Sequence, residues 1–203
     1  MNTRTLVVVT AGLSQPSSTR LLADQLSAAA VTAAAARHLT LDVRVVELRD
    51  LAHDITNHML TGFPPAALRE VLDAVAAADG LIVVTPIFNA SFSGLFKSFF
   101  DVLDADALTD KPVLLAATGG TARHSLALEH ALRPMFAYLR AATVSTSVFA
   151  ASQDWGGDES EGQLRGRITR AAGELAREIA HRDPVSVTDP FALTTSFEDL
   201  LAG

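Results

Sequence analysis

The chain of 203 residues contains no cysteine, one tryptophan and one tyrosine. The lack of cysteine excludes disulfide bonds, thiolate chemistry and zinc sites built from thiolates, and it suits a reducing compartment. Its hydrophobic stretches stay well below the roughly 20 consecutive apolar residues that span a membrane. Residues 1–4 lead directly into an apolar segment and do not have the layout of a signal peptide. We therefore expect a cytoplasmic protein that has no membrane partner.

Basic patches and metal-binding patterns are missing as well. The net charge is −7, and no basic cluster is interleaved with aromatic residues, so nucleic acid is not an expected partner. His53 and His58 are five residues apart, and His124 and His130 are six apart, which is not the spacing of a helical metal site. We expect no metal. The absence of a Gly-x-Ser-x-Gly motif also argues against serine hydrolysis.

What the chain does contain is a regular alternation of short apolar runs with amphipathic segments. Short apolar runs predict strands over residues 4–10, 81–84, 113–117 and 144–149, and the alternation of apolar and polar residues over 41–48 predicts another. Apolar residues at helical spacing predict helices over residues 19–38, 66–78, 125–141 and 164–179, with a further helix after Ser93. We expect a kink at Pro134. Residues 50–65 and 153–161 are expected to be irregular.

This alternation predicts an α/β fold, a doubly wound five-stranded parallel sheet with helices on both faces. Five strands favour the flavodoxin-like order 2-1-3-4-5, in which the switch point lies between the first and third strands. The loops after these two strands should then lie side by side. We expect one domain over residues 1–182, and a tail of residues 183–203 that packs on the domain or at an oligomer interface.

The loop after the first predicted strand, residues 11–18, is rich in hydroxyl groups and precedes a helix. Hydroxyls and free backbone N–H groups at a helix N-terminus favour an anion. Ordinary capping by Ser17 or Ser18 explains the same pattern equally well. The loop has neither the three glycines of a dinucleotide fingerprint nor a Walker lysine, so a bound phosphate is expected to belong to a mononucleotide.

Two further loops are candidates for a ligand site. Pro86 cannot donate a ladder hydrogen bond, so we expect the third strand to end there and residues 86–91 to form a loop. Ser93 is expected to cap the following helix. The fourth strand leads into residues 118–121, Thr-Gly-Gly-Thr, where paired glycines permit close approach of a ligand. Taken alone, that loop is more simply a tight turn.

These three loops together resemble those of NADPH-dependent FMN reductases, over about residues 4–150. The segment Pro-Ile-Phe-Asn-Ala-Ser at 86–91, followed by Gly-Leu-Phe-Lys at 94–97, is similar to a Pro-aromatic-Asn-x-Ser and Gly-x-Leu-Lys stretch of that family. The similarity is greatest to the reductases that accompany luciferase-like monooxygenases. The resemblance implies a phosphate site at Ser14, Ser17, Ser18 and Thr19. It also implies a flavin ring bordered by Pro86, Ile87, Phe88, Asn89 and Ala90 on one side and by Thr118, Gly119 and Gly120 on the other.

The same resemblance implies an NAD(P)H-dependent FMN reductase, with FMN as flavin and NADPH or NADH as hydride donor, that supplies reduced FMN to a partner monooxygenase. No side-chain acid or base is expected to be catalytic, because the flavin accepts the hydride. Arg123 is a candidate contact for the additional phosphate of NADPH, and a solvent-exposed charge at a helix start is the alternative.

Two other functions stay open at this point. One is a quinone or azo-compound reductase with fixed FMN, because the fold does not decide the electron acceptor. The other is a flavodoxin-type electron carrier without turnover, although the Thr-x-Thr-Gly-x-Thr loop of such carriers is absent. Apolar residues spread around the predicted helices near 95–102 and 128–138, which predicts a homodimer or homotetramer.

Overall fold

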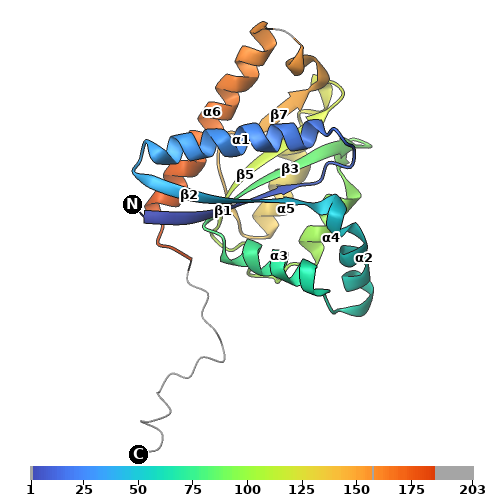
Figure 1. The fold of residues 1–203 in the computed structure, drawn as a ribbon. Coiled ribbons are helices and arrows are strands. Elements are labelled where there is room, and N and C mark those ends of the chain that lie inside the picture. Colours follow the sequence, from blue (N-terminus) through green and yellow to red (C-terminus); the bar gives the residue numbers. More distant parts are fainter. Residues whose placement is uncertain (1, 157, 186–203) are drawn as a thin grey trace, which may run out of the picture.

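A parallel sheet runs through the centre of the computed structural model, which describes residues 2–156 and 158–185 (Figure 1). The strands β1, β3 and β5 lie in the middle, β2 lies at one edge, and β6 and β7 both pair with β5 at the other. The predicted doubly wound fold and the order 2-1-3-4-5 are therefore confirmed, with the fifth position divided between two short strands. Their bounds are β1 (Asn2–Thr10), β2 (Leu39–Glu47), β3 (Gly80–Phe88), β5 (Pro112–Gly119), β6 (Ala142–Thr143) and β7 (Val148–Ala151).

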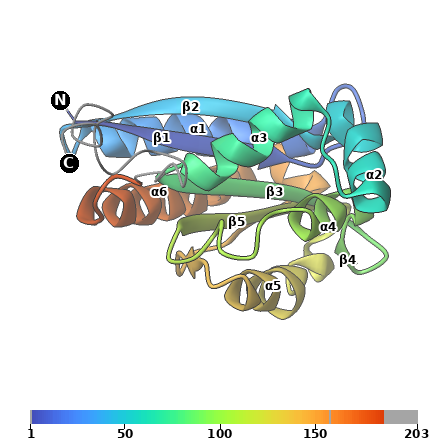
Figure 2. The ribbon, with the colours of Figure 1, turned by 90° about the horizontal axis from the view of Figure 1, so that it is seen from below.

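Helices cover both faces of this sheet, as Figures 1 and 2 show together. The helices α1 (Ser18–Ala35) and α6 (Asp158–His181) lie on one face. The other face carries α3 (Ala66–Ala77), α4 (Gly94–Asp101) and α5 (Arg133–Tyr138), while α2 (Ala52–Thr61) packs against α4.

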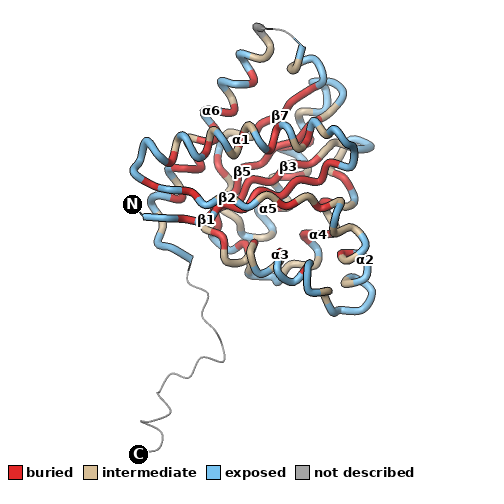
Figure 3. Tube along the Cα trace, viewed as in Figure 1, coloured by how far each residue is buried: buried red, intermediate tan, exposed pale blue. Residues whose placement is uncertain are grey.

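Successive residues of one strand contribute to the two separate cores. In β1, Leu6 and Val8 pack beneath α1 and α6, while Val7 and Val9 pack on the opposite side. This period of two follows from the pleat of a strand. Because both faces are covered, the central strands are apolar without a break, and Figure 3 shows them as the most continuously buried part of the chain.

The segment 50–65 was predicted wrongly to be irregular. It contains a short 3₁₀ helix, Leu48–Leu51, and then α2. Within α2 only Ile55 is fully buried, so the segment has no apolar stripe from which a helix could be predicted. The helix ends at Gly62, whose φ of 76° is the left-handed conformation that favours glycine at this position.

The prediction that β3 ends before Pro86 was also wrong. Pro86 still pairs with Thr118 of β5, and the strand continues to Phe88. The pairing of β1 with β3 stops at Val84, so the missing N–H of Pro86 faces a side where no strand follows. After Phe88 the chain turns and returns as the antiparallel strand β4 (Ser91–Phe92), so the predicted loop 86–91 is a hairpin.

The predicted helix 125–141 is divided into two parts. A π-helical segment, Leu128–Leu132, precedes α5, and Pro134 lies in the first turn of α5 instead of kinking a longer helix. The turn before this proline is wider than an α-helical one, because the N–H of Arg133 donates to the carbonyl of Leu128, five residues earlier. Nearby, the fifth strand lies at 148–151 instead of 144–149. The polar loop predicted over 153–161 contains the 3₁₀ helix η4 (Ser152–Trp155) and the start of α6.

The apolar residues that predicted an oligomer are largely used within the chain. Phe96, Phe99 and Phe100 of α4 are buried in the core of the protein itself. Large apolar side chains that remain exposed include Tyr138 and a group at the end of α2, namely Met59, Leu60 and Phe63. A homo-oligomer therefore stays a prediction, with these residues as its candidate contacts.

The described part of the predicted tail is short, because residues 186–203 lie outside the described ranges. The backbone N–H of Val185 donates to Asp79 Oδ1 at 3.1 Å, so this part of the chain contacts the domain. No helix within the described ranges is both long enough and apolar enough to cross a membrane.

Candidate functional site

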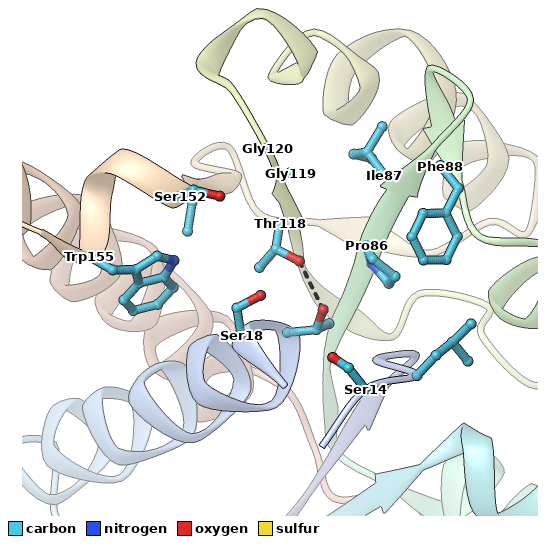
Figure 4. A pocket seen from close by; sticks show the side chains of 13 residues that line it. Ser14, Ser18, Pro86, Ile87, Phe88, Thr118, Gly119, Gly120, Ser152 and Trp155 are labelled. Atoms are coloured by element: carbon cyan, nitrogen blue, oxygen red, sulfur yellow. Dashed lines mark hydrogen bonds between the residues drawn. The ribbon is translucent and has the colours of Figure 1, made fainter. Parts of the chain in front are cut away.

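A pocket of about 450 Å³ opens at the carboxyl ends of β1, β3 and β5 (Figure 4). It includes the switch point between β1 and β3, where ligands bind in doubly wound sheets. Its volume is within the range of small-molecule sites. The residues that line it are Leu13, Ser14, Ser18, Thr19, Pro86, Ile87, Phe88, Thr118, Gly119, Gly120, Ala150, Ser152 and Trp155.

The start of α1 forms the polar end of this pocket. Ser17 is the N-cap, and its Oγ accepts a hydrogen bond from the N–H of Arg20 at 3.2 Å. The N–H groups of Ser18 and Thr19 precede the first intrahelical bond and have no partner in the described part of the chain. Because both residues line the pocket at the positive end of the helix dipole, this end suits an anion.

The loop before α1 is folded tightly enough to require glycine. A Cβ at Gly12 would lie 2.1 Å from the Oγ of Ser17, which is closer than any real contact. The glycine therefore lets the capping serine fold back over the loop. Because glycine has no side chain, the start of α1 can lie close to the end of β1.

A buried hydrogen bond joins the first and third loops across the floor of the pocket. The hydroxyls of Thr19 and Thr118 lie 2.8 Å apart, and their hydrogen bond is the dashed line that ends at Thr118 in Figure 4. Beside this bond the third loop presents backbone instead of side chains. A Cβ at Gly119 would lie 2.8 Å from the ring of Phe149, so a larger residue cannot be added there without movement.

The opposite end of the pocket is apolar. Pro86 and Ile87 are half-buried, while Leu13 and Phe88 are about half exposed at the mouth. The β3–β4 hairpin that carries Phe88 turns at Asn89 and Ala90, whose φ values of 49° and 69° are both left-handed. A slot between apolar side chains and glycine backbone suits a flat ring.

Four predicted site residues lie outside the pocket lining. The hydroxyl of Ser17 caps α1, and Asn89 and Ala90 form the exposed turn of the hairpin. Arg123 lies on the exposed 3₁₀ helix Ala122–His124, directly after the third loop, and likewise does not line the pocket. The other predicted residues of all three loops are brought together.

No charged side chain lines the pocket within the described ranges. Arg20 at the start of α1 is held away by Asp24 at 2.8 Å and by Glu47 at 2.6 Å. The hydrogen bond that the Arg20 guanidinium donates to Asp24 is the main cause that raises the pKa of Arg20. An anion in the pocket is therefore met only by neutral donors and the helix dipole. The combination of an anion end and a ring slot fits a phosphorylated mononucleotide such as FMN.

Four lining residues were missed from the sequence: Leu13, Ala150, Ser152 and Trp155. Ser152 and Trp155 belong to η4, which follows β7 at the same edge of the sheet as the other loops. A correct placement of the fifth strand would have identified this segment, because the loops after all parallel strands meet at that edge.

Comparison with known proteins agrees with this geometry. Residues 4–156 match the family model described as NADPH-dependent FMN reductase. The chain belongs to this family. A relative from Pseudomonas aeruginosa, named FMN reductase (NADPH), is 40% identical over 84% of this chain and 90% of its own. An NADH-dependent FMN reductase of Pseudomonas putida is 39% identical over 82% of this chain and 88% of its own.

Solved structures also resemble this chain in fold. An oxidoreductase from Corynebacterium diphtheriae is 50% identical, covers 90% of this chain and all of its own, and superposes with a TM-score of 0.87. An NADH:FMN oxidoreductase in its apo form is 32% identical over 83% of this chain and 88% of its own, with a TM-score of 0.72. The predicted enzyme class, FMN and the nicotinamide donor are confirmed as those of the family, and an electron carrier without turnover is not supported.

Proposed function

We propose that this FMN reductase acts in the cytoplasm and releases its reduced FMN to a partner monooxygenase, using NADPH or NADH as the donor. The observation that carries the proposal is the neutral pocket. No positive side chain of the described residues lines the pocket, so FMN is held by hydroxyl and N–H donors without an ion pair to its phosphate, and we expect it to exchange. We expect a dissociation constant in the range of roughly micromolar, which permits exchange.

When FMN is bound, its ring supplies the electrophilic nitrogen N5 that accepts the hydride. Ser14, Ser18 and Thr19 bind the phosphate through hydroxyls and backbone N–H groups. Pro86, Ile87 and Phe88 border the ring on one side, and Thr118, Gly119 and Gly120 border it on the other. Ser17, Asn89 and Ala90 act indirectly in this proposal, by capping α1 and by turning the hairpin.

The hydride donor binds at the apolar mouth of the pocket. Leu13 and Phe88 exclude water from the exposed face of the ring, where a nicotinamide stacks close to the reacting atom. The hydroxyl bond between Thr19 and Thr118 keeps the phosphate end and the ring end at a fixed separation. Arg123, exposed and without an ion pair in the described ranges, remains the proposed contact for the additional phosphate of NADPH.

The test follows NADPH oxidation as FMN is added to enzyme freed of flavin, first under air and then under nitrogen. The rate should rise with FMN and saturate, and reduced flavin should appear in a filtrate that excludes protein. An enzyme that keeps one FMN through extensive dialysis, and whose rate does not respond to added FMN, would contradict release. The reductase with fixed FMN that acts on quinones or azo compounds would then replace this proposal.

A further inference from the structure

The pocket contains one aromatic side chain that no sequence pattern assigned to it, Trp155. This residue is the only tryptophan of the chain and ends the 3₁₀ helix η4. Figure 4 shows it on the same side of the pocket as Ser18 and Ser152, with Phe88 on the opposite side. Trp155 therefore lies at the polar end, beside the start of α1, and not at the end where the ring slot opens.

The position of Trp155 is held by contacts within the protein. The carboxylate of Asp154 accepts a hydrogen bond from the N–H of Ala151 at 2.8 Å, which fixes the turn of η4 onto β7. The indole is half-buried and packs against the core beneath α1 and α6. Its orientation toward the pocket is thus preorganised and does not depend on a bound ligand.

The indole N–H makes no hydrogen bond to another described residue, and it is open to the pocket. A tryptophan side chain is a donor only, and an indole N–H in a packed environment usually finds an acceptor. Trp155 makes no hydrogen bond within the described ranges, and Figure 4 shows its nitrogen on the ring edge that faces the pocket. The neighbouring groups at this end are the hydroxyl of Ser18 and the free N–H groups of Ser18 and Thr19. A phosphate oxygen bound among these donors would lie where it can also accept from the indole.

We infer that Trp155 is a further cofactor-binding residue, whose indole N–H donates to an oxygen of the FMN phosphate. It shares this anion with the Ser18 hydroxyl and the first N–H groups of α1. The inference rests on the proposed FMN site and adds a consequence for specificity. Because the bond is made to the phosphate, Trp155 favours FMN over riboflavin, which has the same ring and no phosphate.

Trp155→Phe tests this, because phenylalanine keeps an aromatic ring in the wall and removes the donor. The dissociation constants of oxidised FMN and of riboflavin are measured by titration calorimetry, without turnover. Hydrogen bonds to charged groups are among the stronger ones, so the constant for FMN should rise about tenfold or more. The constant for riboflavin should stay within about twofold. Tyr138→Phe is the matched control, since it removes an aromatic hydroxyl that is exposed outside the pocket.

The possible results distinguish the Trp155 contact from the FMN site on which it depends. Unchanged FMN affinity in Trp155→Phe, or an equal loss for FMN and riboflavin, overturns the phosphate contact. Wild-type protein that binds no FMN overturns the FMN site itself. If Trp155→Phe does not fold, the wild-type protein supplies a second readout, because its fluorescence comes from a single tryptophan. Inorganic phosphate that competes with FMN should shift this emission, and competition without a shift contradicts the inference.

Discussion

The two ends of the parallel sheet satisfy their polar groups in opposite ways. At the carboxyl ends, neutral hydroxyls and unpaired N–H groups surround an open pocket. At the amino ends, charged groups contact one another and the backbone. Asp79 accepts hydrogen bonds from the Arg4 guanidinium at 3.3 Å and from the Thr5 N–H at 2.7 Å. Lys111 donates to two carbonyl oxygens at the end of α3.

The difference between these ends shows how one sheet serves both stability and binding. At the amino ends the Asp79 carboxylate and the two terminal nitrogens of the Arg4 guanidinium make internal contacts, which tie β1, β3 and the end of α6 together. At the carboxyl ends the donors are left available, and the rigid strands behind them hold their positions. A substitution at one end should therefore change stability with little effect on binding, and a substitution at the other should do the reverse.

The largest expected effect is at the amino ends, with Asp79→Ala. Removing this carboxylate leaves the buried Arg4 guanidinium without its ion pair and three donors without their acceptor. Loss of one partner from a buried pair costs about 3 kcal/mol or more of unfolding free energy. Urea denaturation measures the loss of unfolding free energy. The dissociation constant for FMN, measured without urea on the folded protein, should be unchanged.

Asp42→Ala is the matched control for that substitution. Asp42 is exposed on β2 and has no ion pair in the described ranges, so its removal should cost less than about 0.5 kcal/mol. Equal losses of unfolding free energy in the two variants would show that the contacts of Asp79 do not stabilise the protein more than an exposed aspartate does. A large change in FMN affinity for Asp79→Ala would show that the two ends are not independent.

A smaller effect, on binding alone, is expected for Ser18→Asp at the carboxyl ends. The new carboxylate lies beside the phosphate position, and the repulsion should weaken FMN binding by at least about tenfold, or about 1.4 kcal/mol. The helix itself tolerates aspartate in its first turn, so stability should be kept. Ser18→Asn, of similar size and without charge, separates repulsion from bulk, and the prediction fails if both variants bind FMN equally well.

The smallest effect concerns pH and the amino ends. Burial lowers the pKa of Lys111 to about 8, although the charge of Asp79 acts in the opposite direction. Between pH 8 and pH 10 the unfolded chain then binds more protons at this residue than the folded chain, so the free energy of unfolding rises with pH. We expect the advantage of the wild type over Lys111→Met to grow by about 1 kcal/mol for each pH unit in this window. Urea titrations at pH 8, 9 and 10 measure it, and a constant difference would contradict the lowered pKa.

The strand order and most of the pocket were predictable because they depend on patterns that are local in the chain. A buried parallel strand such as β3 is apolar without a break, and its position fixes where the next loop opens. The loops after β1, β3 and β5 are therefore recognisable from composition, and the order of the strands brings them together. Ser14, Ser18 and Gly119 were identified in this way and line one pocket.

The errors arose where tertiary contacts outweigh local pattern. The helix α2 has one fully buried residue, so its formation depends on packing against α4 and not on its own apolar stripe. Pro86 was read as a strand end, yet its missing donor costs nothing beside a strand that has already ended. Trp155 was missed because the fifth strand was placed too early, which moved the following segment away from the pocket edge.

The hydrogen bond between the hydroxyls of Thr19 and Thr118 has a further consequence for the folding of the enzyme. It joins residues 99 positions apart, and the pocket walls come from segments as distant as Leu13 and Trp155. No fragment of the chain can form this pocket early, so it exists only after the whole sheet has assembled. A ligand in it stabilises the complete native state by mass action, without affinity for any partly folded form. Free FMN therefore adds to the stability of the folded enzyme as its concentration rises above the dissociation constant.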